Sequence, residues 1–155
     1  MWIAPEMADP VCLHAPTRKS ISYFGAVRLR DGKLVISRPE GMFNAQTCWD
    51  FLRKLELASR RSGRKVVVIA DNARYHHANL HASWRKSVAD HFAISFLPPY
   101  SPELNPIERV WKLVRRLCLH NQYFPNLEDV VRAVSPIFAD WACPNRTLAR
   151  LCGVA

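Results

Sequence analysis

A run of five apolar residues in the middle of the chain, Val66–Ala70, limits its fold most strongly. Successive side chains of a strand point to opposite faces, so an unbroken apolar run predicts a strand that is buried on both faces. Such strands are typical of the centre of a sheet that helices cover on both sides. The run stops at Asp71, and the carboxyl ends of strands are where α/β sheets bind ligands. The sequence therefore predicts an α/β domain with a candidate site at Asp71.

Two shorter segments before this strand predict an antiparallel hairpin. Alternating apolar residues over 21–27 predict one strand, and 34–37 predict the next. Asp31 and Gly32 lie between them, and both tolerate positive φ, so we expect a tight turn there. The preceding residues 1–19 contain three prolines and are expected to be irregular.

Helical spacing of apolar residues and capping residues predict four helices and one more strand. The strand covers residues 94–97, and the order of elements is therefore β-β-α-β-α-β-α-α, a mixed α/β arrangement. The first expected helix runs from the Asn44 cap to about residue 61, and the second from about residue 78 to 92. The third begins after the Asn105 cap, with Pro106 in its first position, and the fourth begins after the Asn126 cap.

Composition narrows the classes of partner. The chain has 155 residues, which is about one domain, and its net charge is +9. Such an excess favours a polyanionic partner, nucleic acid first, although a solvated basic surface explains it equally well. No apolar run is long enough to span a membrane. The five cysteines are scattered without a CxxC pair, so we expect reduced thiols in a cytoplasm rather than a disulfide framework.

Two carboxylates stand where they can share a site. Asp71 ends the apolar strand, and Glu108 lies in the first turn of the helix that follows the next strand. Paired carboxylates suit Mg²⁺ or Mn²⁺, and two such ions can hold both oxygens of a phosphodiester displacement. Local structure offers another interpretation. Asp71 with Asn72 can start a turn, and Glu108 stands three residues after Asn105, as in a capping box.

Two longer motifs carry a resemblance to a known family. The segments DNARYHHA, which begins at Asp71, and FLPPYSPELNPIERVW, which contains Glu108, resemble the catalytic domain of DDE-type insertion-sequence transposases of the mariner-like superfamily. The similarity runs from Trp2 to about Val134. The resemblance implies a ribonuclease H-like mixed sheet flanked by helices. It also implies that Asp71 and Glu108 are the second and third catalytic acids and metal ligands.

The sequence departs from that family at its beginning. The family's first catalytic Asp lies on the first strand, just upstream of a Trp-Ala-Pro segment, and residues 1–5 here resemble that segment. Asp9, Asp31 and Asp50 are poor replacements because none follows a predicted strand in the right place. We therefore expect one partial catalytic domain, with its core at about 18–135, that lacks its first strand and an upstream helix-turn-helix domain. Loss of that strand would leave unpaired backbone edges and an uncovered apolar gap.

Other residues receive supporting roles. Asn72, His76 and Asn105 are expected to support the acids: Asn72 by holding the turn, His76 by orienting Asp71 or reaching the scissile phosphate. Tyr100 and its neighbouring prolines are expected to fix the loop that aims Glu108. Tryptophans 84 and 111 are expected in the core, and His77 is expected at the surface. The candidate DNA-binding cations, which a solvated surface explains about as well, are Arg74, Arg109, Lys112, Arg115 and Arg116.

The complete protein is expected to be a transposase that cleaves DNA and transfers strands, with two Mg²⁺ or Mn²⁺ ions. Its partners would be the terminal inverted repeats and target DNA, in a homodimer or a pairing with full-length transposase, in the bacterial cytoplasm at the nucleoid. This chain alone is expected to be a poor catalyst. Two alternatives remain open: a non-catalytic DNA-binding or inhibitory fragment, and a nuclease of the same fold without strand transfer.

Overall fold

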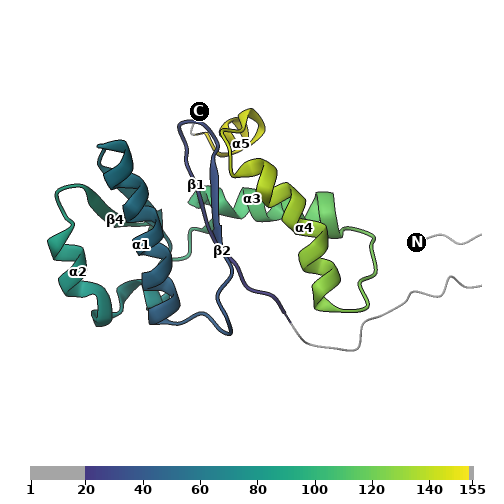
Figure 1. The fold of residues 1–155 in the computed structure, drawn as a ribbon, viewed down its shortest axis with the longest axis horizontal. Coiled ribbons are helices and arrows are strands. Elements are labelled where there is room, and N and C mark those ends of the chain that lie inside the picture. The colour runs from purple at the N-terminus through teal and green to yellow at the C-terminus, as the bar shows by residue number, and fades with distance from the viewer. Residues whose placement is uncertain (1–19, 154–155) are drawn as a thin grey trace, which may run out of the picture.

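The computed structural model describes residues 20–153, which form two small sheets and a set of helices (Figure 1). The expectations for residues 1–19 lie outside the described residues. The strands are β1 (Phe24–Val27), β2 (Leu34–Ser37), β3 (Val66–Ala70) and β4 (Phe92–Phe96). The helices are α1 (Ala45–Ser62), α2 (Ala82–Ser87), α3 (Pro106–Val114), α4 (Leu127–Trp141) and α5 (Arg146–Cys152). No helix within 20–153 is both long and apolar enough to cross a membrane.

Strands β1 and β2 form the expected antiparallel hairpin, but its turn is longer than two residues. Arg28 N donates to Lys33 O at 2.8 Å, which closes a loop between them. Of the two turn residues predicted to adopt positive φ, only Gly32 does so, at 72°. Asp31 instead accepts hydrogen bonds from the Arg28 guanidinium at 2.7 and 2.6 Å. The side-chain contact of Asp31 with Arg28 therefore helps to shape a wider loop.

Helix α1 begins and ends where the sequence predicts. The Asn44 side chain accepts a hydrogen bond from Thr47 N at 2.9 Å, and Thr47 Oγ1 accepts one from Asn44 N, a reciprocal capping box. Gly63 ends the helix in the left-handed conformation, which glycine adopts without a Cβ clash. Local sequence alone is enough to set both ends of this helix.

The second sheet joins β3 and β4 in parallel, with Val66 opposite Phe92 and Ala70 opposite Phe96. The prediction that β3 is buried on both faces is wrong, since Val67 is 56% exposed and Ile69 46%. The reason is topological: within residues 20–153, β3 pairs with β4 alone, and no described element covers the face of Val67 and Ile69. The apolar sequence of β3 is typical of a central strand, but within the described residues β3 is an edge strand.

The helices differ from the predictions mainly in length. Helix α2 has six residues, because residues 74–77 and 79–81 form two 3₁₀ turns before it, and β4 begins at Phe92 rather than 94. Helix α3 starts at Pro106 as expected and continues into a π-helical turn over Arg115–Leu119. Helix α4 follows the Asn126 cap, as predicted. Helix α5 is not predicted, although Asn145 caps it with a 3.1 Å bond from Leu148 N.

Two core clusters lie on opposite faces of the β1–β2 hairpin. Phe24, Ala26 and Val35 pack with α1, α2 and the second sheet. Side chains of the other face, including Leu34, pack with α3, α4 and α5. Figure 1 shows α1 and α2 on one side of the hairpin and α3, α4 and α5 on the other. As expected, Trp84 and Trp111 pack against these clusters, one in each.

Candidate active site

Asp71 begins the turn that follows β3. Its Oδ1 accepts a hydrogen bond from Ala73 N at 3.1 Å, and His76 Nε2 lies 3.3 Å from the same oxygen. The Asp71 side chain is 55% exposed, which is compatible with binding a ligand from solvent. The local interpretation of Asp71 as a turn residue is therefore correct for Oδ1. Among residues 20–153, no hydrogen bond occupies Oδ2.

Glu108 lies in the first turn of α3, but the expected cap at this helix start does not form. The Asn105 side chain accepts no hydrogen bond from the first turn of α3, and only the backbone contact from Glu108 N to Asn105 O, at 3.1 Å, is present. Asn105 is 7% exposed and has φ −88° and ψ 105°. The Glu108 carboxylate is thus not committed to a capping box, and it is available for another role.

Both acids line one small pocket. The pocket has a volume of about 160 Å³ and lies where β3 and β4 end. Because the two strands run in parallel, the segments that follow them leave the same edge of the sheet. The loop after β4 then leads into α3, which brings Glu108 to the pocket. Its lining residues are Asp71, Asn72, Leu97, Pro98, Tyr100, Ser101, Pro102, Asn105 and Glu108.

The loop between β4 and α3 is shaped by its backbone rather than by the Tyr100 ring. Tyr100 is fully exposed and has φ 58°, a left-handed conformation that is uncommon outside glycine. Because the ring is exposed, any part that Tyr100 has in fixing the loop comes from its backbone. Backbone bonds from Leu104 N to Ser101 O and from Asn105 N to Pro102 O, at 3.2 and 3.1 Å, hold the turn instead.

Asn72 ties the two strand ends together beneath the pocket. Its Nδ2 donates to Leu97 O at 2.6 Å, across the sheet, and His77 Nε2 lies 3.2 Å from its Oδ1. The His77 ring also stacks on Phe96 with centroids 4.1 Å apart. These contacts are compatible with the supporting role expected for Asn72, which stays a prediction. His77 is exposed, as expected, but it also packs against the end of β4.

His76 is the more buried of the two neighbouring histidines, with 15% of its side chain exposed. Burial lowers its pKa, and the nearby Asp71 carboxylate opposes that shift only in part. Its Nδ1 lies 3.3 Å from Cys48 Sγ, on α1. The sequence did not identify Cys48 as a site residue, because its spacing fits the apolar face of α1 and no local pattern shows a contact 28 residues away.

The five candidate DNA-binding cations are all exposed, and none lines the pocket. Arg109 differs from the others because its Nη1 donates to Leu151 O at 3.1 Å, which ties α3 to α5. The others, Arg74, Lys112, Arg115 and Arg116, enter no ion pair within the described residues. The structure therefore gives Arg109 a packing role that the sequence did not predict.

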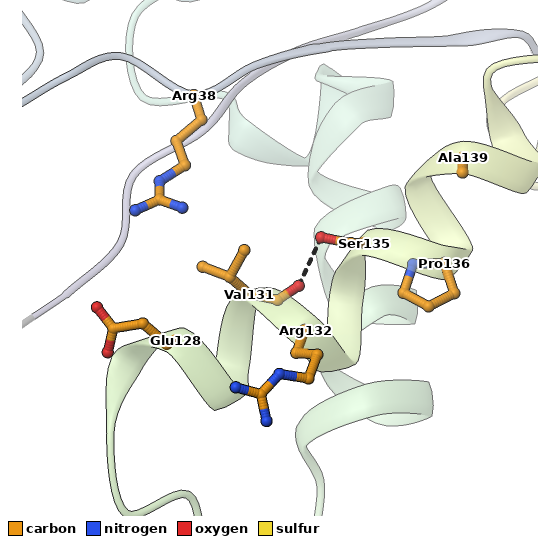
Figure 2. A pocket seen from close by; sticks show the side chains of 7 residues that line it. All are labelled: Arg38, Glu128, Val131, Arg132, Ser135, Pro136 and Ala139. Atoms are coloured by element: carbon orange, nitrogen blue, oxygen red, sulfur yellow. Dashed lines mark hydrogen bonds between the residues drawn. The ribbon is translucent and has the colours of Figure 1, made fainter.

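A larger pocket, of about 640 Å³, lies away from both acids, between Arg38 and α4 (Figure 2). Figure 2 shows Arg38, on the segment after β2, facing helix α4. Glu128 and Arg132 lie in the N-terminal half of α4. Ser135 there donates to Val131 O at 2.7 Å, within the helix itself. This pocket is mostly apolar and has a single carboxylate, so it lacks the acid pair that a metal site needs.

The acid pocket fits part of a divalent metal site. Asp71 and Glu108 supply carboxylates, hard donors of the kind that Mg²⁺ and Mn²⁺ bind. Asn72 and Asn105 also line the pocket, but the Asn72 amide oxygen lies 3.2 Å from His77 Nε2. Within residues 20–153, no group of three or more acidic, His or Cys side chains is placed to hold a metal. The pocket therefore provides two carboxylates as possible ligands of a metal ion.

Comparison with known proteins agrees with this geometry. A family described as "DDE superfamily endonuclease" matches residues 6–131, which include both acids. The chain belongs to this DDE endonuclease family. An uncharacterized protein, y4pE/y4sA, of Sinorhizobium fredii is 39% identical over 69 residues, which are 44% of this chain and 47% of that protein. The chain matches about half the length of this curated relative.

Solved structures show the fold. The crystal structure of the Mos1 strand transfer complex matches 98% of this chain and 44% of its own chain, with a TM-score of 0.71 and 20% identity. The Mos1 mariner paired end complex with Mn matches 98% and 46%, with a TM-score of 0.67 and 18% identity. The predicted ribonuclease H-like, mixed α/β fold is thereby confirmed, and the family match confirms the predicted DDE-type family.

Proposed function

We propose that this chain is the catalytic part of a transposase that cleaves DNA at the ends of a mobile element and transfers the freed strand. The observation that carries the proposal is that Asp71 and Glu108 line one pocket at the ends of β3 and β4. The family's endonuclease description supports DNA cleavage. Strand transfer is supported by the likeness to the Mos1 strand transfer complex.

In this proposal, Asp71 and Glu108 hold Mg²⁺ or Mn²⁺, with two ions in the complete site. When bound, such ions stabilise charge on the phosphodiester oxygens and activate water. Asp71 would bind the ion through Oδ2, because Oδ1 already accepts a hydrogen bond from Ala73 N. Asn72 holds the two strand ends at a fixed spacing through Leu97 O. Asn105 and the loop before it set the position of Glu108.

A third carboxylate would complete the site, and we propose that it arrives on an additional strand between β1 and β3. Within residues 20–153, β1 pairs with β2 alone and β3 with β4 alone, so each has an edge free for pairing. Helix α1 packs against side chains of both sheets, which suits one continuous sheet. Val67 and Ile69 are exposed apolar side chains beside the free edge of β3.

DNA is the proposed partner, as terminal inverted repeats and target. The net charge of +9 and the exposed cations on and after α3 support binding to phosphates. A homodimer, or pairing with a full-length transposase, would bring two element ends together. The likeness to the Mos1 paired end complex supports such an assembly.

The test compares this chain alone with the same chain extended at its N-terminus by the polypeptide encoded directly upstream. With Mg²⁺ or Mn²⁺ and labelled element-end DNA, we expect nicking only by the extended protein. Asp71→Asn and Glu108→Gln should each abolish it. Glu103→Gln is the matched control, since this exposed acid lies five residues before Glu108 and outside the pocket lining.

Three outcomes would change the proposal. Nicking that survives both acid substitutions would remove these residues from the reaction. Nicked products that never join to target DNA would indicate a nuclease without strand transfer. DNA binding without cleavage in either protein would favour a non-catalytic binding or inhibitory module.

A further inference from the structure

Three side chains from two elements form a continuous line that leads from the core to the acid pocket. Cys48 lies on α1 and is fully buried. Its Sγ is 3.3 Å from His76 Nδ1, and His76 Nε2 is 3.3 Å from Asp71 Oδ1. The imidazole thus spans from a buried thiol to a carboxylate that is half exposed.

The chemistry of the two ends decides which ring nitrogen carries the proton. A carboxylate only accepts hydrogen bonds, so a neutral imidazole with its proton on Nε2 suits the nearby Asp71 best, although the 3.3 Å contact is an ion-pair distance rather than a hydrogen bond. Nδ1 must then accept, and the thiol is the one donor beside it. Burial raises the pKa of Cys48 to about 11, so the thiol keeps its proton at neutral pH. The opposite tautomer would set the Nε2 lone pair against the carboxylate.

We propose that Cys48 is a positioning residue that donates its S–H to His76 Nδ1 and so keeps the His76 ring proton on Nε2, the nitrogen that lies 3.3 Å from Asp71 Oδ1. This inference rests on the proposed function, since its purpose is to orient Asp71 as a metal ligand. With Oδ1 engaged by Ala73 N and faced by His76, the remaining oxygen, Oδ2, is free for the pocket. Helix α1 thereby takes part in the site although none of its residues lines the pocket.

The packing around His76 explains why a single weak donor is enough. The ring lies against Tyr75 with centroids 4.6 Å apart, and little of the side chain reaches solvent. Water therefore has limited access to Nδ1, and the thiol takes its place. Outer partners of this kind fix the ring orientation of histidines and the position of ligating groups in metal sites.

The first measurement is the tautomer of His76 in the unmodified chain, by long-range ¹H–¹⁵N correlation NMR near neutral pH. Protonated and unprotonated ring nitrogens resonate in separate ranges, and His76→Gln assigns the signals. We expect a neutral ring with the proton on Nε2. A ring protonated on Nδ1, or an even mixture of tautomers, would overturn the inference, and this result needs no change at Cys48.

The second measurement compares thiol variants. Cys48→Ser keeps a donor and should keep the tautomer, whereas Cys48→Val fills similar space without one and should yield a tautomer mixture. Mn²⁺ affinity, followed by titration, should fall about 10-fold in Cys48→Val, as expected for an outer-shell partner, and less in Cys48→Ser. Cys118→Val is the control, because this buried thiol belongs to the other core cluster.

The two measurements separate this inference from the proposed function. The Nε2–H tautomer in the unmodified chain, together with no Mn²⁺ affinity dependent on Asp71 in the N-terminally extended protein, would contradict the metal site and leave the Cys48–His76 contact established. Cys48→Val with an unchanged tautomer and unchanged Mn²⁺ affinity would overturn the positioning role even if the protein cleaves DNA.

Discussion

Asp71 and Glu108 come from different elements, one after β3 and one in the first turn of α3, yet both line the same pocket. Two features bring them together. Parallel pairing of β3 with β4 places both strand ends at one edge, and the loop from Leu97 to Asn105 returns the chain over that edge. The pocket is therefore a product of the sheet and of a short loop with its own backbone hydrogen bonds.

The acid pair gives the first prediction. Asp71→Asn and Glu108→Gln should each weaken Mn²⁺ binding by more than about 10-fold, because an amide cannot supply the charge of a carboxylate. Neither change should alter the free energy of unfolding by more than about 0.5 kcal/mol, as is usual for side chains that solvent reaches. Isothermal titration and urea unfolding measure the two quantities, with Glu103→Gln as control. A large loss of stability in Asp71→Asn would show that this residue serves the turn rather than a metal.

A second prediction concerns the contact of β1 with α3. A Cβ on Gly25 would lie 2.5 Å from Trp111 Cζ2, closer than real atoms approach. Gly25→Ala should therefore lower the free energy of unfolding by about 1–3 kcal/mol through overpacking. Trp111→Phe removes the clashing ring atoms, so the double variant should lose less than the sum of the single ones. Additive effects in denaturant unfolding would show that this close approach is not the cause.

The elements that the sequence predicted well are those set by local chemistry. The ends of α1 follow from the Asn44 cap and Gly63, and α4 follows from Asn126. Strand β2 was placed correctly for the same reason, since its apolar run is bounded by turn residues. Helix α5 was missed because seven residues carry too little periodicity to stand out, even with a cap at Asn145.

The incorrect predictions depended on distant parts of the chain. The burial of β3 was overestimated because apolar side chains show only that a strand can pack against other elements on both faces. They do not show which elements of the fold lie against it. The Asn105 cap does not form although its backbone is extended, as at the Asn145 cap of α5, so the cause lies in how its buried side chain packs rather than in local backbone geometry. Cys48 gave no signal, since its role depends on a histidine from the turn after β3.

The sequence predicted that Asp71 and Glu108 share a pocket, which the structure shows, while their catalytic roles stay predictions. Asp71 could be placed at a strand end from the apolar run alone. Its pairing with Glu108 was predicted on the condition that the two strands lie close together, and the family resemblance strengthened that prediction. The local sequence between β4 and α3 does not show that this loop folds back over the ends of the two strands, and this fold is what brings Glu108 to Asp71. Tyr100 illustrates the point, since its left-handed backbone is a consequence of that turn.

A third prediction follows from a buried carboxylate on α1. Glu56 is 4% exposed and accepts hydrogen bonds from His91 Nε2, at 2.5 Å, and from Arg60. Burial alone would raise the pKa of Glu56, but these two partners outweigh it and hold the pKa below its usual value of 4.5. A lowered folded pKa means that Glu56 stabilises the protein above its unfolded pKa. That contribution is lost as pH falls through the folded pKa.

Glu56→Gln should therefore remove part of the acid sensitivity of the fold. At pH 7 the variant should be less stable by about 1–3 kcal/mol, since a buried hydrogen-bonded group loses its charged contacts. The difference from the unmodified protein should shrink as the pH is lowered below 4.5. Chemical unfolding at several pH values measures this difference. A gap that stays constant with pH would show that the effect comes from packing alone.

The last prediction separates the two roles available to the cations on and after α3. Arg109 donates to Leu151 O, so Arg109→Ala should lower the melting temperature by loosening α5. Arg116 is exposed in the π-helical turn and enters no ion pair within the described chain, so Arg116→Ala should leave the melting temperature unchanged. If Arg116 contacts a phosphate, its loss should reduce the slope of log Kd against log salt by about 0.9. Calorimetry and DNA titrations at several salt concentrations measure both effects. An unchanged salt slope in Arg116→Ala would assign this cation to the solvated surface rather than to DNA.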